Sequence, residues 1–409
     1  MTMTFNAPGV YVVEEAGGAR PIQAVGTSTA GFVGVAPKAD AFPDQVRAIN
    51  NWTQFKNDFI GDATESTPLS HAVWGFFLNG GRRCFVVNVG AGQPIDGGGR
   101  TRTGLGLLEA IDEIAIVAAP GYADAASYEA LLAHCEKLKD RVAILDTPLD
   151  VPDVLALTRA GTASTRRSRS AEEAAGETPE TASPGMRPRD SDYAAFYFPW
   201  ITVRDPLQPD LLLEVPPSGH LAGIWARTDA TRGVHKAPAN EPIRGALNLA
   251  YRVTREEQGE LNVAGVNCIR LFAREGIRVW GARTLAGGGS EWRYLNVRRL
   301  FNMIEESIAD STNWIVFEPN DRTLWRNIRR DIGAFLTRLW RDGALMGRTA
   351  NEAFFVKCDE ETNSPEIIDA GQVVTLIGVA PVKPAEFIIF RIMQTSAGTE
   401  VEQMGAANG

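Results

Sequence analysis

The sequence predicts a mixed protein that combines α/β and α+β regions in more than one domain. Three observations support this. The chain has 409 residues, which is too many for one ordinary hydrophobic core. Two apolar strands flank an amphipathic helix between residues 113 and 148, which is typical of a βαβ unit. In the C-terminal third, two helical patterns precede three strand-like segments, at 353–358, 372–381 and 385–394.

The first strand is predicted close to the start of the chain. It follows a Pro-Gly break and consists of Val10, Tyr11, Val12, Val13 and Glu14, mostly residue types that favour an extended backbone. The next sixteen or so residues are rich in Gly and Ala and are typical of a flexible connector. A terminal strand on such a connector raises the question of what it pairs with.

Strands and helices then alternate up to a Gly-rich linker. The patterns predict strands at 28–37 and 82–90 with helices at 49–59 and 67–81 between them. The linker, residues 91–104, favours a domain boundary.

The middle of the chain continues with the βαβ unit and then changes character. Residues 158–191 contain almost no large apolar side chain, so we expect a mobile surface loop over about 160–190. A hairpin is predicted at 200–215. The helix predicted at 216–233 follows Pro-Pro and takes Ser218 as its N-cap.

The C-terminal third has the strongest periodicity. A helix is predicted over 294–308, because its apolar residues recur along one face. The segment "NWIVFEPND" reads as extended and supplies an N-cap at Asn320 or Asp321 for a long helix that ends at Gly343. A polar tail follows the last predicted strand.

The long helix separates apolar residues from arginines. Leu324, Ile328, Ile332, Phe335 and Leu339 share one face, and the opposite face carries Arg322, Arg326, Arg329, Arg330 and Arg341. A solvated face usually mixes charge signs and uses Lys as often as Arg. Because Arg favours bidentate contacts with carboxylates, this face is predicted to dock on an acidic partner. A merely solvated face is the alternative.

Composition excludes several classes of function. A net charge of −9 disfavours direct nucleic-acid binding, and no apolar run approaches the ~20 residues that span a bilayer. No secretory signal pattern is recognisable at the N-terminus. The cysteines, Cys84, Cys135, Cys268 and Cys358, stand alone and are expected to be buried free thiols. The four histidines lack metal-ligand spacing, so neither a metal nor a cofactor is predicted.

An enzyme remains an alternative. The sequence contains neither a phosphate-binding P-loop nor a GxSxG nucleophile motif. Asp146 ends a strand of the βαβ unit, where α/β enzymes often place a carboxylate, and a hydrolase or phosphotransferase could use it. No second acid lies at DxD spacing, so a structural Asp at a strand end is the simpler interpretation.

Three stretches resemble one protein family. They are "PGVYVVE" near the N-terminus, "VPPSGHLAGIWARTDATRGVHKAPANEPI" at 215–243, and the run from "YLNVRRLFNMIEESI" through "WIVFEPNDRTLWRNI" to the closing strands. Together they are similar to sheath proteins of contractile phage tails, R-type tailocins and extracellular contractile injection systems. The resemblance covers most of the chain except residues 91–190.

The resemblance implies a domain plan and a set of partners. An N-terminal arm (1–22) and a C-terminal arm (395–409) would flank an inner, tube-facing domain made of 23–101 and 246–394. An outer α/β domain (102–245) would be inserted between its two parts. Subunits would form stacked hexameric rings around an inner tube, with baseplate and terminal cap proteins at the ends. The particle would assemble in the bacterial cytoplasm, as a phage tail or a related particle that can be released from the cell.

The resemblance also implies what the first strand pairs with. In this family, terminal arms cross to neighbouring subunits and add strands to their C-terminal sheets, which is β-augmentation. The strand Val10–Glu14 would be the donor. The accepting sheet would include Val373, Val374, Leu376, Phe387 and Ile389. A static tube or shell protein that exchanges strands without contracting is a further alternative.

Overall fold

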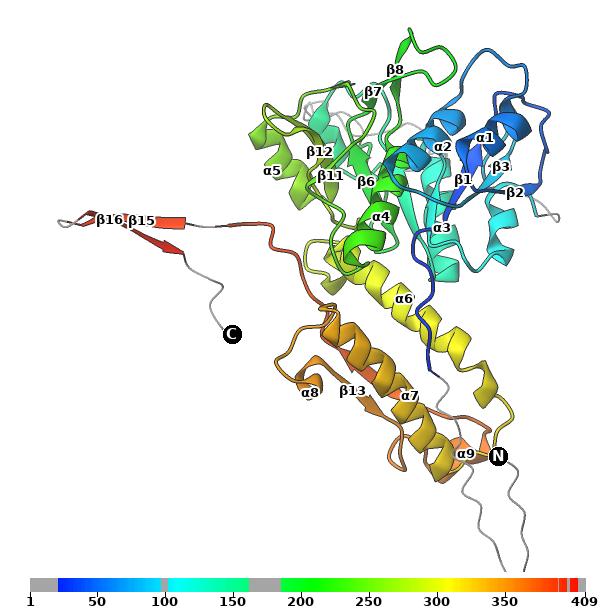
Figure 1. Ribbon diagram of the computed structural model, residues 1–409, viewed down its shortest axis with the longest axis vertical. Helices are drawn as coiled ribbons and strands as arrows, with labels where there is room; N and C mark the ends of the chain where they lie inside the picture. Colours follow the sequence, from blue (N-terminus) through cyan, green and yellow to red (C-terminus); the bar gives the residue numbers. More distant parts are fainter. Residues whose placement is uncertain (1–20, 97–101, 162–184, 389, 396–397, 404–409) are drawn as a thin grey trace, which may run out of the picture. The chain divides into compact units, whose positions relative to one another are not determined.

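A computed structural model describes residues 21–96, 102–161, 185–388, 390–395 and 398–403. The chain divides into two compact units. Unit 1 contains the described residues 21–23 and 307–380, and unit 2 contains 24–306 and those from Pro381 onward. Figure 1 shows the elements in chain order. The structure is a mixed α/β fold, as the sequence predicts, and it contains one large mixed sheet.

Unit 2 is built on a nine-stranded sheet in the order β2-β3-β1-β4-β5-β6-β11-β12-β9. Its central six strands run parallel, and β2, β12 and β9 are antiparallel to their neighbours. The parallel strands are β1 (Ala30–Gly34), β3 (Cys84–Asn88), β4 (Ile116–Ala118), β5 (Val142–Asp146), β6 (Ala194–Phe198) and β11 (Val266–Phe272). The antiparallel ones are β2 (Val46–Ile49), β12 (Gly276–Val279) and β9 (Glu241–Pro242).

Both faces of this sheet are covered, which explains the nearly continuous apolar runs of its central strands. Successive residues enter opposite cores: Phe32 packs on one side and Val33 on the other. The first core includes side chains of α2 (Pro68–Asn79) and α4 (Ser218–Arg232). The second includes α3 (Ala125–Leu138) and Leu261 of α5 (Arg255–Val263). All four cysteines are buried free thiols, as predicted.

Helices α2 and α4 touch backbone to backbone, because glycines line their contact. A Cβ at Gly219 would lie 2.2 Å from the Cα of Ala72, and one at Gly223 would lie 2.4 Å from the carbonyl oxygen of Phe76. Any larger side chain at these two positions would therefore force the helices apart.

Shorter elements complete unit 2. A three-stranded sheet has the order β10-β7-β8 and contains the predicted hairpin. Its strands are β7 (Ile201–Arg204), β8 (Leu212–Val215) and β10 (Asn248–Leu249). The short helices are α1 (Trp52–Phe55), η1 (Lys56–Ile60), η2 (Gly104–Ala110), η3 (Val154–Thr158) and η4 (Glu291–Arg293). Helix α6 (Leu295–Ser311) begins in unit 2, and its last residues are assigned to unit 1.

Unit 1 packs a long amphipathic helix on a small sheet. Helix α7 (Arg322–Arg341) contacts β13 (Phe354–Lys357), which pairs antiparallel with β14 (Leu376–Val379). The remaining elements are η5 (Asn313–Ile315), α8 (Ala350–Ala353) and α9 (Pro365–Asp369). Asp321 is the N-cap of α7, since its Oδ1 accepts the Leu324 N–H at 2.8 Å. This is one of the two caps that the sequence offers.

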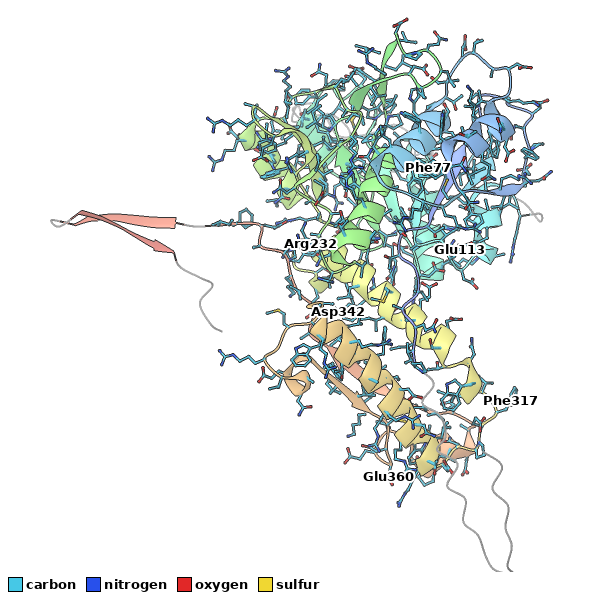
Figure 2. The ribbon with its side chains drawn as sticks, in the orientation of Figure 1. Phe77, Glu113, Arg232, Phe317, Asp342 and Glu360 are labelled. Carbon is cyan, nitrogen blue, oxygen red and sulfur yellow. The ribbon has the colours of Figure 1, made fainter. Side chains whose placement is uncertain are left out.

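Several predicted elements differ from the structure. The segment after α6, predicted to be extended, forms the 3₁₀ turn η5, and Phe317 follows with a φ of 71° and a fully exposed ring (Figure 2). The strands predicted at 372–381 and 385–394 shrink to β14 and β15 (Phe390–Thr395). The predicted polar tail contains β16 (Gly398–Gln403), which pairs with β15.

The large sheet crosses one predicted domain boundary, and the division into inner and outer domains stays a prediction. Strands from both sides of the Gly-rich segment 91–104 share the large sheet, with Ala30 of β1 opposite Ile116 of β4. Most of the predicted loop at 160–190 lies outside the described residues. Its ends meet in a bridge between Ala160 and Arg187, and Arg187 is buried. Which residues face a tube or the exterior stays a prediction.

Candidate assembly surfaces

The N-terminal strand Val10–Glu14 lies outside the described residues, but the place where its connector reaches unit 1 is described. Ile22 is buried, and its carbonyl oxygen accepts a hydrogen bond from Nη2 of Arg338 on α7. The N–H of Gln23 donates to Oγ of Ser311 at 3.3 Å. We call residues 21–23 the N-terminal root. This root is held by side chains of unit 1 that act on its backbone.

The arginine face of α7 is exposed, and its apolar face is largely buried. Leu324, Ile328, Ile332 and Phe335 are buried and Leu339 is half-buried, whereas all five predicted arginines are exposed. Arg322 pairs with Glu360 at 2.7 Å, and Arg330 with Asp331 at 2.9 Å. Within the described part of the chain, we find no ion pair for Arg326, Arg329 or Arg341. These three are therefore the arginines best placed to meet an external carboxylate.

The small sheet of unit 1 exposes apolar side chains. Phe355 on β13 is 58% exposed and Leu376 on β14 is 51% exposed. An isolated two-stranded sheet is marginally stable in water, and each of its strands has a side that can accept a further strand. Pairing with another strand would cover such an edge and complete the sheet.

The structure brings together only part of the predicted acceptor set. Leu376 begins β14, while Val373 and Val374 precede it. Val374 is fixed there by Asn363, whose Oδ1 accepts the Val374 N–H at 2.7 Å. Phe387 lies in unit 2, and Ile389 lies outside the described residues. The described β-strand that can act as an acceptor near the predicted set is thus β14, together with β13.

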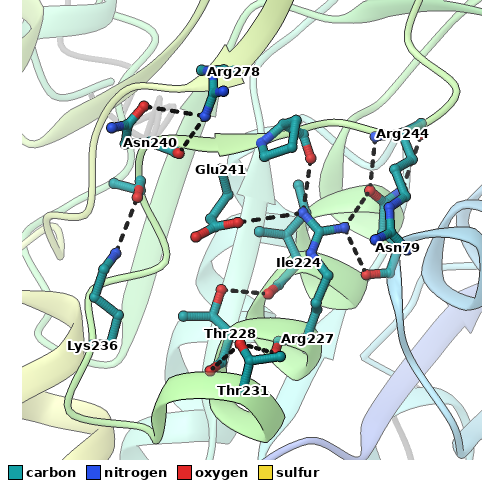
Figure 3. A network of polar contacts seen from close by, with 12 residues as sticks. Asn79, Ile224, Arg227, Thr228, Thr231, Lys236, Asn240, Glu241, Arg244 and Arg278 are labelled. Carbon is teal, nitrogen blue, oxygen red and sulfur yellow. Dashed lines mark hydrogen bonds and ion pairs between the residues drawn. The ribbon is translucent and has the colours of Figure 1, made fainter. Parts of the chain in front are cut away.

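The 215–243 stretch is held by an internal polar network (Figure 3). Nη1 of Arg227 on α4 donates to the carbonyl oxygen of Asn79 at 3.0 Å, and its Nη2 donates to that of Pro242 at 2.8 Å. The Asn79 side chain bonds both backbone groups of Arg244, accepting its N–H at 2.9 Å and donating to its C=O at 3.1 Å. These contacts fasten the loop after α4 to α2. Arg227 in this stretch therefore has a structural role, because it connects α4 to α2 and to Pro242.

Ser218 and Asp146, 72 residues apart, meet at the start of α4. Pro217 is the N-cap of this helix, so the prediction that Ser218 caps it is wrong. Instead, Asp146 accepts from Ser218 twice, from the backbone N–H at 2.9 Å and from Oγ at 2.6 Å. Burial raises the pKa of Asp146 to about 7, although both Ser218 bonds act to lower it. The carboxyl group that an enzyme might use is thus committed to a helix N-terminus.

His220 gives no catalytic partner to Ser218. The ring is fully buried, and burial lowers its pKa to about 3. Neither ring nitrogen has a hydrogen-bond partner among the described residues. In the same part of the chain, no group of His, Cys, Asp and Glu side chains is arranged to hold a metal ion. No described helix is long and apolar enough to cross a membrane.

Comparison with known proteins decides the family. Residues 103–285 match the phage tail sheath protein central domain, and residues 289–395 match the phage tail sheath C-terminal domain. The chain belongs to the phage tail sheath family. Its members are structural, so the sequence predictions of a sheath subunit and of a protein without enzymatic activity are confirmed.

Relatives of this sheath protein occur in phages. It is 31% identical over 193 residues to the tail sheath protein of Vibrio phage KVP40, which covers 46% of this chain and 28% of the relative. It is 28% identical over 280 residues to the tail sheath protein of Salmonella phage ViI, which covers 66% of this chain and 42% of the relative. The chain therefore spans less than half the length of these curated relatives.

Solved sheath structures match nearly the whole chain. The sheath of an extracellular contractile injection system, the PVC sheath complex in its contracted state, is 30% identical with a TM-score of 0.77. That match covers 97% of this chain and 99% of the other. The contracted helical sheath of the anti-feeding prophage is also 30% identical, with a TM-score of 0.73, covering 96% of this chain and 100% of the other.

Proposed function

We propose that this sheath protein polymerises as stacked hexameric rings around an inner tube, and that contraction of the cylinder drives the tube through a target envelope. The observation that supports this most directly is the similarity to the contracted PVC sheath over 97% of the chain.

Neighbouring subunits are linked by strand exchange in this proposal. The strand Val10–Glu14 of one copy adds to the β13–β14 sheet of another. The exposed Phe355 and Leu376 and the small size of this sheet support that assignment. Main-chain hydrogen bonds along an added strand hold subunits together, and the connectors let them rotate.

The remaining partners are the inner tube, the baseplate and a terminal cap. The tube would meet the exposed arginines of α7, above all Arg326, Arg329 and Arg341. A chain in the anti-feeding prophage baseplate structure is 30% identical to this protein, with a TM-score of 0.71, which supports a baseplate partner. Assembly takes place in the bacterial cytoplasm, and the product is a phage tail or a related particle.

Negative-stain electron microscopy of the purified full-length chain tests this function. We expect striated cylinders, and two cylinder lengths when the inner tube is co-expressed. Cylinders of a single length under all conditions would favour a static tube or shell. Small discrete particles would contradict polymerisation altogether.

A further inference from the structure

The segment that leads to the C-terminal hairpin is fastened to unit 2. We call residues 381–388, which join β14 to β15, the strap. Ala380 still belongs to unit 1, whereas the chain from Pro381 onward belongs to unit 2. Beyond the strap, β15 and β16 pair with each other over six residues each. The strap therefore leads to β15–β16, within which the predicted C-terminal arm (395–409) begins, and we call the strap the C-terminal root.

One ion pair holds the strap. Glu386 faces the guanidinium of Arg283 in a bidentate arrangement, with Nε to Oε1 at 2.9 Å and Nη2 to Oε2 at 2.5 Å. The side chains are only 17% and 9% exposed. Such planar, two-bond pairs are the strongest contacts between side chains of opposite charge, and partial burial reduces their screening by salt.

Arg283 is fixed before it meets the strap. The fully buried side chain of Asn267 on β11 accepts the Arg283 N–H at 2.7 Å and donates to the Arg283 C=O at 2.8 Å. A Cβ at Gly281 would lie 2.8 Å from Oδ1 of the same Asn267, so this approach requires glycine there. The third contact of the guanidinium is Nη1 to the carbonyl oxygen of Asn262 at 2.9 Å. Its orientation is thus set by unit 2 alone.

A second contact holds the start of the strap. Nδ2 of the buried Asn296, on α6, donates to the carbonyl oxygen of Val382 at 3.0 Å and to that of His235 at 2.8 Å. Between these two contacts, Pro384 and Ala385 help to line a hollow of about 520 Å³ beside α5, together with Trp280. The strap therefore lies against unit 2 from Val382 to Glu386.

The side chains that follow Glu386 are exposed. The next two residues, Phe387 and Ile388, are 74% and 73% exposed, although both are large and apolar. Glu386 is thus the last strap residue that the rest of unit 2 covers.

We propose that the Arg283–Glu386 pair is a clamp that fixes the root of the C-terminal arm, so that the β15–β16 hairpin reaches a neighbouring copy from a defined point. This proposal rests on the proposed sheath function. Fixing one end of an arm raises its effective concentration at the neighbour and lowers the entropy lost on docking. Arg283 and Glu386 are positioning residues for assembly rather than part of the contact between subunits.

The test compares three full-length variants. Glu386→Gln removes the charge and keeps the shape, and Glu386→Asp keeps the charge but is too short for both bonds. The control, Glu361→Gln, breaks an exposed ion pair with Lys357 in unit 1. Hydrogen exchange of the 381–388 peptide, measured before polymerisation, should accelerate about 10-fold or more in Glu386→Gln, as expected for loss of a charge-assisted pair. It should accelerate less in Glu386→Asp, and the control should match the wild type.

Electron microscopy of the same samples gives the second readout. Glu386→Gln should form fewer and less ordered cylinders than the control. Unchanged exchange in both Glu386 variants would overturn the clamp. Faster exchange with normal cylinders would overturn its role in positioning the arm. A wild-type chain that forms no cylinders, but whose strap still loosens in Glu386→Gln, would instead contradict the proposed function.

Discussion

An arginine holds the root of each arm, but the group that accepts its hydrogen bonds differs between the two roots. At the N-terminal root, Arg338 of unit 1 grips a backbone carbonyl, that of Ile22. At the C-terminal root, Arg283 of unit 2 grips the side chain of Glu386. A backbone acceptor is present whatever residue occupies the position, whereas a carboxylate can be removed by one substitution. The first root therefore tolerates sequence change in the arm, and the second depends on one residue type.

The two arms also differ in the part of the chain to which they are attached. Each root belongs to a different unit of the chain. We therefore expect each arm to move with the unit that holds its root.

Removing residues 1–16 should abolish polymerisation while leaving both units folded. The truncated chain loses the donor strand Val10–Glu14, and with it several hydrogen bonds between copies at ~0.5–1.5 kcal/mol each. Val12→Pro should act similarly if its N–H points at the neighbour, since proline removes a ladder donor. Sedimentation and electron microscopy measure the effect. Normal cylinders from the truncated chain would mean that this strand is not the link between copies.

Charge reversal at Arg326 and Arg329 should leave the arms working but separate the sheath from its tube. Individual exposed pairs contribute only ~0.2–1 kcal/mol, but every subunit repeats them. We expect empty or contracted cylinders when Arg326→Glu and Arg329→Glu are combined, as seen by electron microscopy with co-expressed tube. Reversal at Arg322, which already pairs with Glu360, is the control and should have the smaller effect. Extended, tube-filled cylinders from the double variant would place the tube contact elsewhere.

Asp146→Asn should change how unfolding of unit 2 depends on pH. Because burial raises the folded pKa of Asp146 to about 7, the native state keeps a proton that the unfolded state releases near pH ~4. The stabilisation by this group is full below pH ~4 and is lost as the pH rises to about 7. It amounts to no more than ~4 kcal/mol, at 1.36 kcal/mol per pKa unit.

The measurement for Asp146 is the difference in unfolding free energy between wild type and variant across pH 4–8. Taking the difference cancels the opposite contribution of His220, whose lowered pKa makes the wild type more stable as the pH rises. The unfolding free energy of the wild type should fall steadily relative to that of Asp146→Asn up to pH ~7. Above this pH the difference should level off. A flat difference would mean that Asp146 is ionised in the folded protein throughout this range.

Arg338→Ala should weaken unit 1 more than Arg341→Ala does. Arg338 loses its bond to Ile22, and a hydrogen bond to a charged group contributes ~1.5–3 kcal/mol. Arg341 lies on the same helix and has no ion pair within the described residues, so its removal should cost less than ~0.5 kcal/mol. Denaturant unfolding measures both. Equal losses would show that the N-terminal root adds nothing to the stability of unit 1.

Local sequence patterns predict many helices and strands of this fold, because apolar periodicity and helix caps determine where these elements form. Helix α7 follows its apolar periodicity and its Asp321 cap, and the buried parallel strands follow their apolar runs. The same reasoning gives a wrong prediction for the segment after α6. Its apolar residues favour a strand, but no described strand pairs with it, and a 3₁₀ turn forms instead.

Contacts between residues far apart in the sequence were out of reach of such patterns. Arg283 and Glu386 are 103 residues apart, and Asn267 of β11 hydrogen-bonds the backbone of Arg283. Ser218 is taken by Asp146, 72 residues earlier, so its own tendency to cap a helix is overridden. Nothing close to these residues in the sequence marks their partners.

The outer strand of the large sheet limits where copies can join. Strand β9 consists of Glu241 and Pro242 only, and its backbone is further occupied because the Pro242 carbonyl accepts a bond from Arg227. A two-residue strand with one N–H is too short to form a ladder of hydrogen bonds with a strand from another copy. The broad β-structure of unit 2 is therefore shielded from mispairing at this border.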